Sequence, residues 1–71
     1  MNETQHIIQF FAFGHLPPRL AAVSRPFCDL ADALVTGAEA LPDNPERLAA
    51  LRKLLEAKDA AVRALVAKVT P

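Results

Sequence analysis

Residues 41–65, LPDNPERLAALRKLLEAKDAAVRAL, decide the fold because they contain both a helix start and a long apolar repeat. Asn44 is a strong N-cap residue, Pro45 suits the first helical position, and Glu46 complements the positive end of the helix dipole. Beyond this start, two series of mostly apolar residues recur every seven positions: Leu48, Leu55, Val62 and Val69, and Leu51, Lys58 and Leu65. The pattern predicts a helix over about residues 45–68, with one lysine in its apolar seam.

The preceding segment predicts a second helix over about residues 18–36. Its apolar residues alternate at spacings of three and four, the same seam pattern: Leu20, Val23, Phe27, Leu30 and Leu34. Pro26 lies inside this helix and removes a hydrogen bond to the carbonyl of Ala22, so we expect a kink or loosened turn there. Ser24 is placed to bond to a freed carbonyl. Gly37 is expected to end the helix.

A shorter helix is predicted at the start of the chain, over about residues 3–13. Asn2 can cap it, and Gly14 stands where a residue in the left-handed conformation is expected to end it. The predicted fold class is all-α, with one domain over residues 1–71. In this arrangement the short N-terminal helix folds against an antiparallel hairpin of the two longer helices.

Length and composition favour self-association. A 71-residue chain buries only about 60% of its unfolded surface, yet 52% of these residues are hydrophobic. Cys28 is the only cysteine, so no intramolecular disulfide can form, and His6 and His15 with one thiol make a poor zinc set. Oligomerisation is the remaining common source of stability for a small domain.

Several classes of function find no support in the sequence. There is no nucleophile motif, metal-binding motif or glycine-rich phosphate loop, so we expect neither an enzyme nor a cofactor or metal. The formal net charge of zero argues against binding to duplex nucleic acid. No signal-peptide pattern and no apolar run of about 20 residues is present, so a cytoplasmic location without membrane contact is expected.

Two clusters could bind a ligand or could simply pack. Phe10, Phe11 and Phe27 are expected in the core, whereas Phe13 precedes a turn and has cations nearby, as a ring that stacks on a nucleobase would. Lys58 could extend from the edge of the seam into solvent, or it could hold an anion together with Arg63.

The order of four blocks along the chain resembles a known family. These blocks are FAF (11–13), HLPPRL (15–20), VSRPFCDLADALV (23–35) and LPDNPERLAALRKLLEAKDAAVRA (41–64). They are similar to the helical-hairpin family of phage anti-defence sponges, which includes the anti-CBASS cyclic-nucleotide sponges and a related domain of anti-Thoeris proteins. The resemblance extends over about residues 6–67.

The resemblance implies a non-enzymatic, phage-encoded protein that acts in the cytoplasm of the infected bacterium. Such proteins form compact homohexamers that bind cyclic dinucleotides, such as cyclic GMP-AMP, between subunits without cleaving them, so the immune effector stays inactive. The resemblance makes Phe13 the base-stacking ring, in place of a frequent tyrosine. Pro17 would lie beside it, and Ser24 and Arg25 would contact phosphate. Arg63, with Lys58 beside it, would belong to a separate cyclic trinucleotide site.

Two other functions fit the same residues. A helical hairpin with a leucine seam could act as an oligomerisation or protein-interaction module that binds no small molecule. A sponge could instead bind a cyclic ADP-ribose isomer, as the related anti-Thoeris proteins do.

Overall fold

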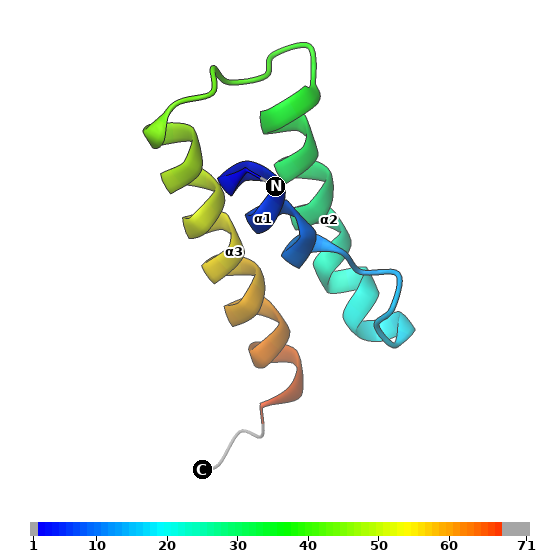
Figure 1. Ribbon diagram of the computed structural model, residues 1–71. Coiled ribbons are helices and arrows are strands. Elements are labelled where there is room, and N and C mark those ends of the chain that lie inside the picture. The colour runs from blue at the N-terminus through cyan, green and yellow to red at the C-terminus, as the bar shows by residue number, and fades with distance from the viewer. Residues whose placement is uncertain (1, 68–71) are drawn as a thin grey trace.

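The computed structural model describes residues 2–67. Its elements in chain order are α1 (Glu3–Ile8), the 3-10 helix η1 (Gln9–Phe11), α2 (Pro18–Thr36) and α3 (Pro45–Val66). No strand occurs within residues 2–67, so the all-helical prediction is confirmed. Figure 1 shows α2 and α3 side by side and running in opposite directions, with α1 lying across them.

The start of α3 forms as the sequence predicts. The Asn44 side chain accepts a hydrogen bond from the amide of Arg47 at 2.9 Å, and Pro45 occupies the first turn. This cap satisfies one of the amides that a helix N-terminus leaves without a partner. The helix ends at Val66, with Ala67 as its C-cap. The predicted end at residue 68 lies outside the described residues.

The bounds predicted for α2 are also confirmed, but the expected role of Ser24 is wrong. The helix begins at Pro18, continues through Pro26 and is capped by Gly37. The Ser24 side chain is fully buried, and its hydroxyl has no hydrogen-bond partner within residues 2–67. It therefore packs inside the fold, where its small size is the useful property, and it does not bond to a carbonyl freed by the proline.

The first helix begins as predicted and ends early. The Asn2 side chain accepts from the Gln5 amide at 2.8 Å, and the Gln5 side chain accepts from the Asn2 amide at 3.1 Å, which forms a capping box. The α-helix stops at Ile8 and tightens into η1, and Ala12 then turns the chain to extended geometry (ψ 140°). Gly14 does not adopt a positive φ, so the expectation of a left-handed C-terminal cap is wrong.

A small core joins the three helices. Its buried apolar residues are Ile7 from α1, Phe11 from η1, Ala31 from α2 and Leu51 from α3. Phe11 is only 1% exposed, as predicted, and Phe27 packs against the core.

Phe10, by contrast, is 48% exposed, so its assignment to the core is wrong. Phe10 and Phe11 are consecutive residues, and a helical turn directs consecutive side chains to different sides. Only one of the two rings can therefore enter the space between α2 and α3.

Candidate functional site

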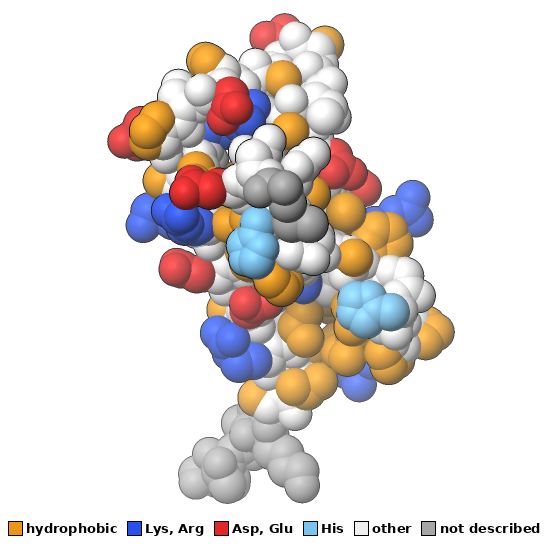
Figure 2. Space-filling model, viewed as in Figure 1, with side chains coloured by type: hydrophobic (Ala, Val, Ile, Leu, Met, Phe, Trp, Pro, Cys, Tyr) orange, Lys and Arg blue, Asp and Glu red, His pale blue; other side chains and the backbone are white. Residues whose placement is uncertain are grey.

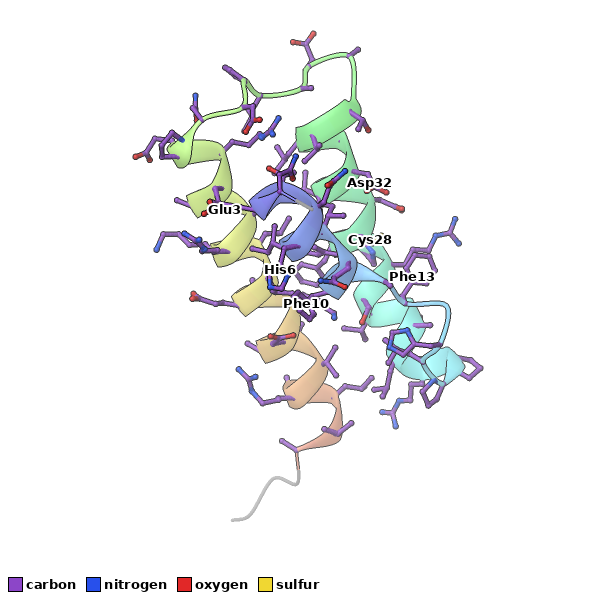
Figure 3. All side chains as sticks on the ribbon, viewed as in Figure 1. Glu3, His6, Phe10, Phe13, Cys28 and Asp32 are labelled. Carbon is purple, nitrogen blue, oxygen red and sulfur yellow. The ribbon has the colours of Figure 1, made fainter. Side chains whose placement is uncertain are left out.

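The first candidate surface is the loop between η1 and α2, where Phe13 and Pro17 lie. The Phe13 ring is partly exposed, and its carbonyl accepts a hydrogen bond from the amide of Leu16 at 3.1 Å. Pro17 is the exposed N-cap residue of α2. In Figure 3 Phe13 lies beside α2, away from Glu3 and His6. A partly exposed ring is therefore held next to a helix start.

Arg25 and Ser24 of α2 have opposite environments although they are neighbours in sequence. The Arg25 side chain is 69% exposed and makes an i,i+4 ion pair with Asp29 at 3.8 Å. Exposed pairs of this kind contribute about 0–1 kcal/mol, so the guanidinium can exchange this carboxylate for another anion at little cost. Ser24 is fully buried and offers no surface to a ligand in the single chain. Three of the four predicted dinucleotide contacts thus have exposed surface, and Ser24 has none.

Lys58 and Arg63, the two residues predicted for a trinucleotide site, have different environments. The Lys58 Nζ donates to the Phe10 carbonyl at 2.7 Å, and its side chain is only 12% exposed. In the single chain, Lys58 therefore stabilises the end of η1. It neither extends into solvent nor holds an anion with Arg63, the two roles considered for it from the sequence. Arg63 is exposed. Five residues of helix rotate a side chain by about 140°, so Arg63 faces away from Lys58.

A second candidate surface consists of two adjoining hollows between α1 and α3. Both are lined by Asn2, Glu3, Leu48 and Arg52. One extends to Asn44 and Pro45 at the start of α3, and the other extends to His6, Phe10 and Leu55. We use the name α1/α3 groove for the surface formed by Glu3, His6, Phe10, Leu48, Arg52 and Leu55. Neither hollow is lined by any of the predicted binding residues, which are Phe13, Pro17, Ser24, Arg25, Lys58 and Arg63.

One wall of the groove is a row of side chains on α1 and η1. Glu3, His6 and Phe10 are spaced by three and four residues, and Figure 3 shows them following one another along this segment. The rings of His6 and Phe10 meet edge to face, with 5.4 Å between their centroids. Figure 2 shows acidic, basic and hydrophobic side chains together on the face where α1 lies in Figure 1. The groove thus combines apolar surface with both signs of charge.

Two arginines of α3, Arg47 and Arg52, have different environments. Arg47 is only 8% exposed, and its guanidinium contacts Asp43 at 2.9 Å, the Leu41 carbonyl at 3.2 Å and the Thr4 hydroxyl at 3.3 Å. It therefore ties the loop before α3 to α1.

Arg52 is exposed, and neither it nor Glu3 makes an ion pair with any residue in the range 2–67. Neither arginine is among the site residues predicted from the sequence. The signal for Arg47 was its place four residues before the seam residue Leu51, on the same side of the helix.

Cys28 does not have the properties of a reactive thiol. Burial raises the pKa of the Cys28 thiol, and the neighbouring carboxylates of Asp32 and Asp29 raise it further, against a smaller opposing effect of Lys58. A raised pKa keeps the thiol protonated near neutral pH, and the protonated form is the poorer nucleophile.

Two further searches cover the residues that the structure describes. In that part of the chain, no group of three or more His, Cys, Asp or Glu side chains could hold a metal ion. None of its helices combines the length and the apolar character needed to cross a membrane.

Comparison of the chain with family models, with curated proteins and with solved structures finds no match. The case for a function therefore comes from the side chains described above and from the resemblance of the sequence blocks.

Proposed function

We propose that this chain is a phage-encoded sponge that self-associates and sequesters cyclic dinucleotides between its copies without cleaving them. The observation that carries the proposal is the exposure of Phe13, Pro17 and Arg25, which the resemblance assigns to one ligand-binding surface. They offer a partly exposed ring and a loosely paired cation to solvent, and none of them lines either hollow between α1 and α3. In the proposed assembly a second copy covers this surface and completes the pocket.

The chemistry of a cyclic dinucleotide fits this surface. Stacking of a base on an aromatic side chain contributes about 1–3 kcal/mol per base, and Phe13 is partly exposed in the single chain. The guanidinium of Arg25 can leave Asp29 for a phosphate, which accepts stronger, bidentate hydrogen bonds. Two bases and two phosphates related by a twofold axis match two copies that each supply one ring and one cation.

Self-association is supported by the imbalance between core and surface. Within residues 2–67, four apolar side chains form the buried core, while large apolar side chains from several parts of this range are exposed: Phe10, Leu30, Leu41 and Val66. Burial of apolar surface between copies would stabilise each chain further. The proposed assembly is a homohexamer of helical hairpins in the cytoplasm of the infected host. By binding cyclic dinucleotides, this assembly would deprive the host's immune effector of its messenger.

The proposed trinucleotide site keeps only one of its two predicted residues. Arg63 is its phosphate contact, because its side chain is exposed near the end of α3. Lys58 is left out of this site, because its ammonium is bound to the Phe10 carbonyl and Arg63 faces away from it.

The test is calorimetric titration of cyclic GMP-AMP into the wild-type protein and into the double variant Phe13→Ala/Arg25→Ala. We expect binding by the wild type and a loss of affinity of at least about 100-fold in the variant, because both the stacking and the phosphate contact disappear. Lys53→Ala, which removes an exposed cation of α3 outside this surface, is the matched control and should bind normally. Wild-type affinity in the double variant would refute the assignment of the site.

A plain interaction module is the second candidate function. The exposure of Leu30 and Val66, which belong to neither candidate site, favours it. The same titration distinguishes the two functions when the ligand panel includes cyclic di- and trinucleotides and a cyclic ADP-ribose isomer. An assembly that binds none of these ligands would be an interaction module. Selective binding of the ADP-ribose isomer would keep the sponge and change its ligand.

A further inference from the structure

The α1/α3 groove has the properties of a surface that contacts a second protein molecule. Its floor contains Leu48 and Leu55, and the Phe10 ring at its edge is 48% exposed. An aromatic ring exposed beside an apolar floor loses unfavourable contact with water when another molecule covers it. The Phe10 backbone is held in place, because its carbonyl accepts a hydrogen bond from the Lys58 ammonium group at 2.7 Å. The ring is therefore presented by a rigid support.

The charges of the groove indicate what covers it. Glu3 and Arg52 line both hollows, and neither forms an ion pair with a residue in the described range. One acid and one base on the same face make that face complementary to itself. Under a twofold axis, the acid of each copy meets the base of the other, and both pairs form at once. A ligand or partner of a single charge would satisfy one of the two groups and repel the other.

We propose that the α1/α3 groove is a contact surface between two copies of this chain, in which Glu3 of each copy pairs with Arg52 of the other and the Phe10 rings are covered. This inference rests on the self-association in the proposed function, and it identifies the surface that produces it. Neither Phe13 nor Arg25 lines this groove, so in the proposed assembly one copy has a second face for its neighbours. An assembly larger than a dimer requires at least two such faces.

The test uses charge reversal in the full chain and measures the assembly mass by sedimentation equilibrium. Glu3→Arg gives a face with two cations, and Arg52→Glu gives a face with two anions. Each variant alone should dissociate at a concentration at least about tenfold higher than the wild type, because like charges then meet twice across the axis. Lys53→Glu, a charge reversal beside Arg52 but outside the groove, is the matched control and should assemble like the wild type.

Mixing the two single variants distinguishes pairing between copies from pairing within one chain. An equimolar mixture should form assemblies that contain both variants in alternation, since a face with two cations then meets a face with two anions. Native mass spectrometry of one isotopically labelled variant detects this composition. Pairing within a chain cannot be restored by mixing. Circular dichroism before mixing checks that Glu3→Arg, which places a cation at the start of α1, remains folded.

The Phe10 ring gives a second readout that does not depend on charge. Phe10→Ala should weaken assembly by at least about tenfold, because large aromatic side chains contribute much of the binding energy at protein contacts. Lys53→Ala is its control, since it truncates a long exposed side chain of α3 that lies outside the groove.

Three outcomes would overturn the inference: wild-type assembly by both charge variants, random composition of the mixture, or equal effects of Phe10→Ala and Lys53→Ala. Titration of cyclic GMP-AMP into the same samples separates this inference from the proposed function. Unchanged assembly of the charge variants together with ligand binding would reject the groove and retain the sponge. Preferential mixing without any ligand binding would retain the groove and reject the sponge.

Discussion

The two candidate surfaces both include a phenylalanine and an arginine, yet the ion pairing of the two arginines differs. In the α1/α3 groove, Arg52 has no acidic partner within the described residues and lines a hollow that Phe10 also borders. At the other surface, Arg25 pairs with Asp29, and Phe13 lines neither hollow. Residue types alone therefore do not distinguish a ligand contact from a contact between proteins. The environment of the cation does.

The largest effect is expected from removing the buried ring that lies between Phe10 and Phe13 in the chain. This ring belongs to Phe11, which is 1% exposed, so Phe11→Ala should reduce the free energy of unfolding by about 3–5 kcal/mol. Urea denaturation followed by circular dichroism measures this change. Because such a loss can unfold a small domain outright, Phe11→Leu provides a milder variant with an expected loss of about 1 kcal/mol. A Phe11→Ala protein as stable as the wild type would refute the proposed core.

A smaller loss of folding stability is expected from removing Arg47, which joins the loop before α3 to α1. Arg47→Ala leaves the Leu41 carbonyl and the Thr4 hydroxyl without their partner and should cost about 2 kcal/mol of folding stability. Arg63→Ala removes an exposed arginine from the same helix and should change stability by less than about 0.5 kcal/mol. Equal stability of the two variants in urea would contradict the anchoring role of Arg47.

The smallest effect concerns the bond that fixes Phe10. Lys58→Met keeps most of the apolar stem but removes the donor to the Phe10 carbonyl, so it should cost about 1 kcal/mol. The loss should be local: amide hydrogen exchange should accelerate at Ala12, whose amide bonds to the Gln9 carbonyl in η1. Lys53→Met, at an exposed position of α3, is the control. Unchanged exchange at Ala12 in Lys58→Met would show that the bond does not hold η1.

The sequence predicts those parts of the fold that local chemistry controls. Asn2, Asn44 and Gly37 act within a turn of their own helix, and all three cap the helices as expected. The end of the first helix could not be predicted in this way. The Phe10 carbonyl is held by Lys58, 48 residues away in the chain, and this contact arises only after α3 has packed.

For the candidate sites too, local features could be predicted from the sequence, and features that depend on packing could not. Exposure of Arg25 and partial exposure of Phe13 agree with their expected place at a surface, and their ligand remains a prediction. Burial of Ser24 could not be read from its polar side chain, because the packing of α2 against the rest of the fold determines it. The α1/α3 groove joins residues more than 40 positions apart, so it has no local sequence pattern.

The most direct test of the central claim is native mass spectrometry of the wild-type protein with and without cyclic GMP-AMP. The proposed function predicts an assembly of several copies that gains whole ligand molecules, which are released chemically intact when the protein is denatured. A single chain that gains no ligand, or a released ligand that has been cleaved, would contradict it.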